Sequence, residues 1–169
     1  MRGRGRSSRA GPSVLIDTTF LLPALGIEVE PDAMRVIKYF HAVRVHYIEA
    51  SLLEALWKIL KLVSDDELNR VEVGIDAIKE TYERADPPAE AYIEAYRLYH
   101  QGHRDYIDNL LYSTSRILNI PLLTIDQTLR DFLRMRGYPT ENLMTPNDLI
   151  KSLNPVSYTH LTLPTILLV

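Results

Sequence analysis

The amino-acid sequence predicts a three-layer α/β/α domain with a mostly parallel central sheet. Short apolar runs typical of buried strands, over residues 13–17, 42–48 and 120–125, alternate along the chain with segments of helical periodicity. Such alternation favours parallel strands that are covered by helices on both faces. The chain has 169 residues, of which 46% are hydrophobic and 24% are charged, and these values are ordinary for one globular domain.

The two ends of the chain differ in composition from the region between them. Residues 1–12 contain four arginines, no acidic residue and no apolar segment, so we expect a disordered leader or a tag there and no signal peptide. Residues 154–169 form an abrupt Thr-, Leu- and Pro-rich tail that resembles translated adapter sequence, and their apolar run is too short to cross a membrane. We therefore expect a single domain over residues 13–153.

Charge and cysteine content narrow the functional classes. The net charge of −3 includes the four arginines of residues 1–12, so residues 13–169 carry −7. An acidic domain does not suit passive binding of nucleic acid through lysine and arginine, but it suits an enzyme whose carboxylates bind a divalent metal ion. The chain has no cysteine, which excludes disulfides and thiolate metal sites and agrees with a reducing, cytoplasmic location.

The first part of the domain is expected to contain two strands and a helix. Ser13–Asp17 is a buried strand with a carboxylate at its C-terminal end, and residues 18–23 continue as a helix or loop. The spacing of apolar residues over 32–40 predicts an amphipathic helix, with Asp32 as its cap. The strand over 42–48 follows.

A capping pattern predicts where the next helix begins. Ser51 and Glu54 match the Ser-x-x-Glu pattern of a capping box, so we place the start of a helix at Ser51. The apolar residues that define this helix are Leu53, Leu56, Trp57, Leu60 and Val63. Residues 65–84 and 88–101 predict two further helices, which a Pro-Pro pair separates.

The segment from Asp108 to Asp126 predicts how the site is built. Apolar residues at helical spacing end at Asn119, which predicts a helix of about 11 residues that rises about 16 Å. The apolar run 120–125 predicts a buried strand of about 18 Å. Because the two lengths match, the strand returns along the helix and brings Asp126 back beside Asp108.

The C-terminal part predicts a helix over 128–136 that Gly137 ends, a short strand over 141–145, and a final helix over 146–153. Right-handed crossovers place the C-terminal ends of parallel strands and the N-termini of the following helices at one edge of the sheet. Ligands bind at that edge in folds of this class.

Four carboxylates are expected at this edge. Asp17 and Asp126 end strands, whereas Glu54 and Asp108 lie in the first turns of helices. Converging carboxylates repel one another and raise one another's pKa, and a divalent cation removes the conflict. Oxygen ligands without Cys or His favour Mg²⁺ or Mn²⁺ over zinc, and such an ion activates water for the hydrolysis of a phosphodiester.

Each of these acids also has a purely structural explanation. Asp17 and Asp126 fit turns, Glu54 completes a capping box, and Asp108 suits the positive end of a helix dipole. Their joint placement at one edge is what favours a metal site. If the helix register differs from the predicted one, Asp105 takes the place of Asp108 and Glu49 takes the place of Glu54. We call Asp105 and Glu49 the reserve acids.

Short motifs around the four acids resemble those of PIN-domain ribonucleases, the family that includes the VapC-type toxins of bacteria and archaea. The motifs are Val14-Leu-Ile-Asp17-Thr-Thr, Ser51-Leu-Leu-Glu54, and Asp108-Asn-Leu-Leu-Tyr-Ser-Thr followed by Thr124-Ile-Asp126. The resemblance covers roughly residues 13–150. The chain has Tyr112-Ser-Thr-Ser where the family commonly has Ala-Ala-Thr-Ala, and this departure leaves the acids intact.

The resemblance implies a metal-dependent endoribonuclease with a PIN-like fold. It implies that Asp17, Glu54, Asp108 and Asp126 bind Mg²⁺ or Mn²⁺ and catalyse hydrolysis without a covalent intermediate, and that Thr19 and Thr124 support the site. The expected substrate is RNA, either single-stranded or in an exposed loop. The expected partners are a second copy of the chain or an antitoxin-like inhibitor, for which the tyrosines of residues 92–99 offer a surface unless they pack in the core.

Other functions remain open. A non-catalytic PIN-like module for RNA binding or scaffolding keeps the fold without using the acids. A phosphatase of the haloacid-dehalogenase type needs a second aspartate two residues after Asp17, where Thr19 stands, so it is the weaker enzymatic alternative. Four cations are either phosphate contacts or ordinary surface charges, namely Lys58, Arg104, Arg116 and Arg130.

Overall fold

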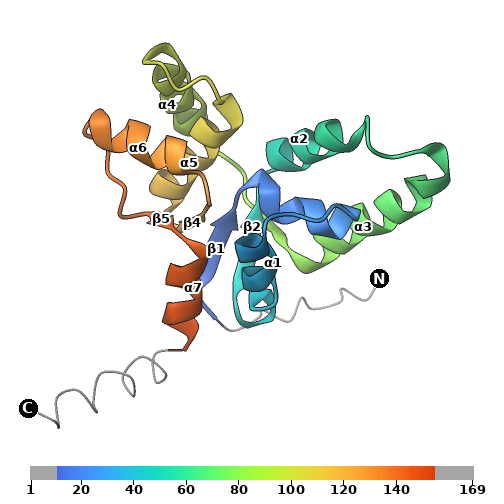
Figure 1. Ribbon diagram of the computed structural model, residues 1–169. Helices are drawn as coiled ribbons and strands as arrows, with labels where there is room; N and C mark the ends of the chain where they lie inside the picture. Colours follow the sequence, from blue (N-terminus) through green and yellow to red (C-terminus); the bar gives the residue numbers. More distant parts are fainter. Residues whose placement is uncertain (1–10, 155–169) are drawn as a thin grey trace, which may run out of the picture.

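The central sheet has five parallel strands in the order β3-β2-β1-β4-β5, within residues 11–154 that the computed structural model describes. The strands are β1 Ser13–Ile16, β2 Arg44–Tyr47, β3 Glu83–Arg84, β4 Leu122–Leu123 and β5 Leu143–Met144 (Figure 1). β1 lies at the centre and pairs with β2 on one side and with β4 on the other. The leader predicted over 1–12 and the tail predicted over 154–169 lie almost wholly outside the described residues.

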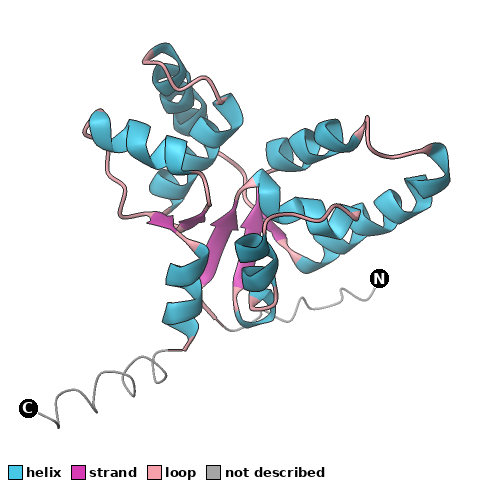
Figure 2. Ribbon diagram, viewed as in Figure 1, coloured by secondary structure: helices cyan, strands magenta, loops and turns pink. Residues whose placement is uncertain are grey.

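Helices cover both faces of the sheet (Figure 2). The α-helices are α1 Pro31–Ile37, α2 Glu49–Ile59, α3 Leu68–Thr81, α4 Ala89–His100, α5 Tyr106–Leu118, α6 Gln127–Met135 and α7 Pro146–Leu153. The 3-10 helices of the described part of the chain are η1 Thr18–Leu25, η2 Phe40–Ala42 and η3 Asp65–Glu67. Side chains of η1, α1, α2, α3 and α7 form a core on one face, and side chains of α4, α5 and α6 form a second core on the other.

The two cores receive alternate residues of each strand, because successive side chains of a strand point to opposite faces of the sheet. In β1, Val14 and Ile16 pack in the first core and Leu15 in the second. β4 is divided in the same way, with Leu123 in the first core and Leu122 in the second. The three-layer α/β/α prediction is therefore confirmed. No helix in the described part of the chain has the length and apolar composition needed to cross a membrane.

Most predicted elements are present with small changes in their bounds. The strands over 13–17 and 42–48 are confirmed, and so is the final helix over 146–153. The helix before Asn119 is also confirmed, and Asn119 has a φ of 54°, the left-handed conformation that commonly ends a helix. The apolar run 120–125 contains β4, which is shorter than predicted.

β3 was not predicted, because its two residues, Glu83 and Arg84, are charged and have no apolar pattern. The helix that was predicted over 65–84 ends at Thr81, and the chain then runs beside β2 with Glu83 opposite His46. β3 is an edge strand, and charged residues are common on edge strands because they oppose pairing with other chains.

Two predicted helix caps are wrong. α2 begins at Glu49, two residues before Ser51, and the residue that precedes it, Ile48, makes no side-chain capping bond. Ser51 is fully buried inside the helix, and its hydroxyl group has no hydrogen-bond partner. Ile48 directly follows β2 and is fully buried, so α2 begins without a polar cap. Asp32 does not cap α1, which begins at Pro31, because a first-turn proline has a preset φ and no N–H to satisfy.

The apolar side chains that predicted the helix after Ser51 lie mostly on its outer face. Leu53 is 63% exposed, Trp57 74% and Leu60 69%. The buried residues of α2 are Ser51, Leu52, Ala55 and Ile59. The helix therefore has two apolar stripes, and periodicity alone does not say which of them faces the core.

Candidate active site

The C-terminal ends of β1 and β4 bring the first group of predicted site residues together. The two strands are neighbours, with Ile16 opposite Leu123. Asp17 follows β1 directly and Thr124 follows β4, so their side chains meet at the same edge of the sheet and form a hydrogen bond. Asp126 stands two residues further along, where α6 begins.

Asp17 is a buried carboxylate, only 6% exposed. It accepts a hydrogen bond from the backbone N–H of Thr19 at 3.0 Å and another from the hydroxyl group of Thr124. Burial raises the pKa of Asp17 to about 6, because the two hydrogen bonds offset only part of the cost of removing the charge from water. The charge of Asp126 also raises this pKa, and the charge of Lys58 lowers it.

Thr124 joins two of the acids. Its hydroxyl group donates to Asp17 and accepts a hydrogen bond from the backbone N–H of Asp126 at 3.1 Å. Asp126 in turn caps α6, where its Oδ1 accepts the N–H groups of Thr128 at 2.9 Å and Leu129 at 3.2 Å. Thr124 therefore contacts the acids through its side chain, whereas the other predicted supporting residue, Thr19, does so through its backbone.

Asp108 lies in the first turn of α5, and its carboxyl group is hydrogen-bonded to that of Asp126. Burial raises the pKa of Asp108 well above its ordinary value, and the charges of Asp105, Asp17 and Asp126 raise it further. A hydrogen bond between two carboxyl groups requires a proton between them, so protonation relieves their repulsion when no cation is bound. Sequence reasoning therefore placed Asp108 beside Asp126 correctly.

Asp105, the reserve for Asp108, is also part of this cluster. It caps α5, since its carboxylate accepts the backbone N–H of Asp108 at 3.0 Å. Its position three residues before Asp108 and just ahead of an apolar helical stripe is the sequence signal of such a cap. Glu49, the reserve for Glu54, lies instead at the start of α2 and lines a hollow that does not include Glu54.

Glu54 is connected to the aspartates through Lys58. Because α2 begins early, Glu54 lies in its second turn, and its Oε1 is 2.9 Å from the Nζ of Lys58. Burial alone lowers the pKa of Lys58, but Glu54 and then Asp105 and Asp108 raise it above its ordinary value. Lys58 is thus a counter-ion for acids on two different helices, α2 and α5.

The other three cations that were considered as phosphate contacts in the sequence do not pair with the predicted acids. Arg104 stacks over the ring of Tyr99, 4.7 Å from its centre, and Arg116 forms an ion pair with Glu94. Arg130 has a buried guanidinium nitrogen, Nη2, with no hydrogen-bond partner. None of these contacts involves one of the four predicted acids.

The chemistry of the cluster fits a hard divalent cation. Among residues 11–154, no three His, Asp or Glu side chains are close enough to form a finished metal cage as they stand. The side chains gathered here nevertheless offer only oxygen donors, and the raised pKa values of Asp17 and Asp108 report carboxylate charge that is poorly compensated. Mg²⁺ and Mn²⁺ prefer such donors and would supply the missing positive charge.

Comparison with known proteins identifies the same fold. The protein-family model of the PIN domain matches residues 14–134 of this sequence. A toxin–antitoxin complex from Klebsiella pneumoniae superposes with a TM-score of 0.55 at 13% identity, over 79% of this chain and 97% of that chain. The protein PAE2754 from Pyrobaculum aerophilum gives a TM-score of 0.58 at 15% identity, over 87% of this chain and 98% of that chain.

A third similar structure is the Sarcin-Ricin loop cleaving toxin VapC20 from Mycobacterium tuberculosis, with a TM-score of 0.53 at 16% identity over 75% of this chain and 96% of that chain. No curated protein matches the sequence. The family match includes the four predicted acids Asp17, Glu54, Asp108 and Asp126. From the span of this match and the shared fold we conclude that the chain belongs to the PIN-domain family.

Proposed function

We propose that the protein is an endoribonuclease that hydrolyses RNA phosphodiester bonds with Mg²⁺ or Mn²⁺ held by Asp17, Glu54, Asp108 and Asp126. The observation that carries the proposal is the set of close carboxylates at one sheet edge, where Asp17 is buried with a pKa of about 6 and the pKa of Asp108, beside Asp126, is raised above its ordinary value. Membership of the PIN-domain family supports the same activity.

The acids divide into two proposed roles. Asp17 and Asp108 would hold the cation directly, and Asp17 is oriented by the N–H of Thr19 and the hydroxyl group of Thr124. Glu54 and Asp126 would hold it directly or through water and would orient the water that attacks the phosphorus. When bound, the cation supplies activation of water and compensation of the charge on the phosphate. Water is the nucleophile, so the chain forms no covalent intermediate.

Lys58 has a proposed part in binding the phosphate. Its ammonium group lies 2.9 Å from the carboxylate of Glu54. Once a divalent cation compensates the acids, this ammonium group is free to donate a hydrogen bond to a phosphate oxygen. Its side chain is 53% exposed, so RNA reaches it from solvent.

Single-stranded RNA or an exposed loop is the proposed substrate, and the cytoplasm is the proposed location. The acids read no base, and an unpaired strand presents both its backbone and its bases. One similar solved structure is that of a Sarcin-Ricin loop cleaving toxin, which supports an RNA loop as the target class.

We also propose a protein partner of the antitoxin type or a second copy of the chain. One similar solved structure is a toxin–antitoxin complex, which supports the first. The expected alternative, that the tyrosines of α4 pack in the core, is wrong for two of them: Tyr92 is 43% exposed and Tyr96 59%, with Ile93 between them 56% exposed. Light scattering at dilute concentration tests the second copy, and a monomer mass would contradict it.

Cleavage of a labelled single-stranded RNA in Mg²⁺, Mn²⁺ or EDTA tests the activity. We expect the wild-type chain to cleave with either metal and not in EDTA, and Asp17→Asn to abolish cleavage while the fold persists. Asp76→Asn, on the exposed side of α3, is the matched control and should cleave as wild type does. The alternative function, a non-catalytic RNA-binding or scaffolding module, predicts no metal-dependent cleavage and unchanged RNA affinity in Asp17→Asn.

A further inference from the structure

Three hollows with shared lining residues lie around the start of α2, between Glu54 and the end of β3. The first, of about 390 Å³, is lined by Ala50, Leu53, Glu54, Trp57, Lys58 and Ile107. The second, of about 170 Å³, shares Ala50 with the first. The third, of about 350 Å³, shares Glu49 and Arg84 with the second and also contains Lys79. Neighbouring hollows thus share lining residues, and we call the series, from Glu54 to Lys79 and Arg84, the groove.

The far end of this groove lies at the same edge of the sheet as the acids. Arg84 ends β3, Tyr47 ends β2, and Asp17 directly follows β1, and these three strands are consecutive neighbours in the sheet. Neighbouring strands are about 4.8 Å apart, so the ends of β1 and β3 are separated by about 10 Å along the edge. A strand of RNA that is bound at Asp17 therefore has further phosphates within reach of Arg84.

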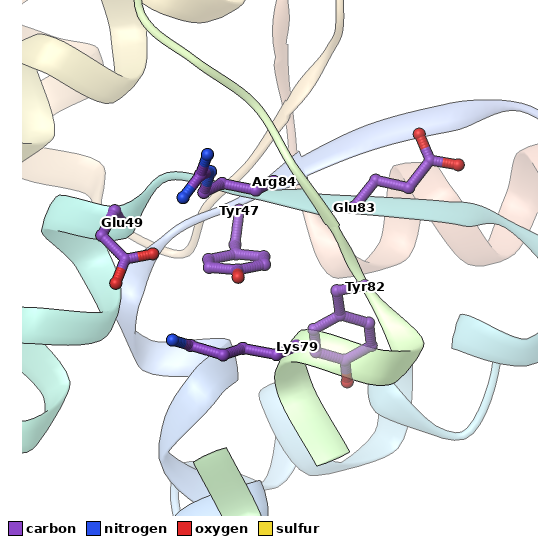
Figure 3. A pocket seen from close by; sticks show the side chains of 6 residues that line it. All are labelled: Tyr47, Glu49, Lys79, Tyr82, Glu83 and Arg84. Carbon is purple, nitrogen blue, oxygen red and sulfur yellow. The ribbon is translucent and has the colours of Figure 1, made fainter. Parts of the chain in front are cut away.

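The third hollow presents two cations on one side. In Figure 3 the ammonium group of Lys79 and the guanidinium group of Arg84 lie on the same side of the pocket, with the ring of Tyr47 between them. The carboxylate of Glu83 points away from both, and it is paired with Arg44 at 3.1 Å. Within residues 11–154, neither Lys79 nor Arg84 forms an ion pair, and both are exposed.

We propose that Lys79 and Arg84 form a phosphate-binding subsite for the backbone of single-stranded RNA, a few nucleotides from the bond cleaved at Asp17. This inference rests on the proposed ribonuclease function, because the substrate of that function is the polyanion that the groove would hold. RNA bound in an acidic protein needs local positive charge away from the metal, and these two uncommitted cations supply it. In the first hollow, beside Glu54, the exposed ring of Trp57 offers an apolar surface to an unstacked base.

Replacing Glu49 should change RNA affinity in the opposite direction from replacing the two cations. Its carboxylate lies on the side of the pocket that Lys79 and Arg84 share, so it opposes a phosphate there (Figure 3). Removing this charge should strengthen RNA binding, whereas removing the cations should weaken it. A surface that binds RNA elsewhere predicts neither change.

Fluorescence anisotropy of a labelled single-stranded RNA, measured in EDTA so that no cleavage occurs, tests the subsite. We expect the double variant Lys79→Ala/Arg84→Ala to bind about tenfold more weakly at low salt. The slope of log affinity against log salt should fall by about 1.4, which is two phosphates at about 0.7 each. Lys38→Ala/Arg134→Ala removes the same charge from two exposed positions, one directly after α1 and one on α6, and should retain the slope. Glu49→Gln should tighten binding.

Trp57 provides a second measurement, because it is the only tryptophan of the chain. RNA in the groove should change its fluorescence, and the double variant should need more RNA for the same change. Equal affinities and slopes in the two double variants would overturn the subsite. The subsite would also be overturned if Lys79→Ala/Arg84→Ala bound RNA as the wild type does but no longer bound an acidic protein. Binding that depends on Lys79 and Arg84 without any metal-dependent cleavage would refute the nuclease and retain the subsite. Thermal unfolding checks that the variants fold.

Discussion

Replacing Asp17 with Asn should stabilise the metal-free protein at neutral pH although it destroys the proposed activity. Asp17 is 6% exposed, and its pKa is raised from 3.8 to about 6, mainly by burial. A group whose pKa is higher in the folded than in the unfolded chain stabilises the fold fully below its unfolded value, and this contribution is lost as pH rises through the folded value. The metal-free wild type should therefore lose stability between pH 4 and pH 7.

The size of this effect follows from the shift. About two pKa units at 1.36 kcal/mol each give about 3 kcal/mol at pH 7. Asn has no charge to bury, and its carbonyl oxygen still accepts the hydrogen bond from the N–H of Thr19. For a domain of this size, a gain of up to about 3 kcal/mol raises the melting temperature by up to about 6–12 °C. The raised pKa of Asp108 acts in the same direction, so the wild type should weaken further at higher pH.

Thermal and urea unfolding in EDTA, from pH 4 to pH 8, measures the difference between the two proteins. We expect Asp17→Asn to be the more stable at pH 7 and the difference to disappear near pH 4. Mn²⁺ should stabilise the wild type more than the variant, because the variant lacks one of the ligands and binds the ion more weakly. The reasoning is refuted if Asp17→Asn is less stable than the wild type in EDTA at pH 7, or if their difference does not change with pH.

Three further predictions concern single contacts. Thr124→Val removes the hydroxyl group that joins Asp17 to Asp126, so its Mn²⁺ affinity, measured by calorimetry, should fall at least about tenfold. Thr124→Ser keeps the hydroxyl group and should retain the affinity. Equal affinities of the two variants would count against this role. Arg116→Leu leaves Glu94, only 9% exposed, without its ion-pair partner, and should cost about 2 kcal/mol in urea unfolding with Mn²⁺ binding unchanged. Asn119→Gly relieves a φ of 54° and should stabilise by about 0.5 kcal/mol, so a loss of stability would contradict this.

The meeting of Asp108 and Asp126 could be predicted from sequence because it depends on lengths along the chain. A helix and a strand of matched length return the chain to its starting level, and the two carboxyl groups do form a hydrogen bond. Asp17 could be placed for a similar reason, since it directly follows an apolar run that forms the central strand.

The surroundings of Glu54 could be predicted only in part. The spacing of four residues between Glu54 and Lys58 on a helix is enough to suggest their ion pair. The start of α2 was predicted wrongly because the helix begins directly after the buried Ile48 without a side-chain cap, which is the feature that the prediction used. The approach of Lys58 to the acids of α5 also depends on how two helices pack, and no local pattern in the sequence reports it.

No pattern in the sequence predicts the groove beyond the acids. Arg84 reaches the functional edge only because a two-residue strand pairs with β2, and so short a charged strand has no alternation to recognise. Lys79 lies in the last turn of α3, where a lysine is also common because it complements the helix dipole.

The measurement that tests the proposed site most directly is a calorimetric titration of Mn²⁺ into the wild type, Asp108→Asn and Asp76→Asn. We predict that the wild type and the α3 control bind Mn²⁺ with equal affinity and that Asp108→Asn binds at least about tenfold more weakly, because one of two direct ligands is lost. A wild type that binds no Mn²⁺, or an Asp108→Asn variant that binds it as the wild type does, would contradict the metal site. The acids would then be structural, and the non-catalytic module would be the better description of this PIN domain.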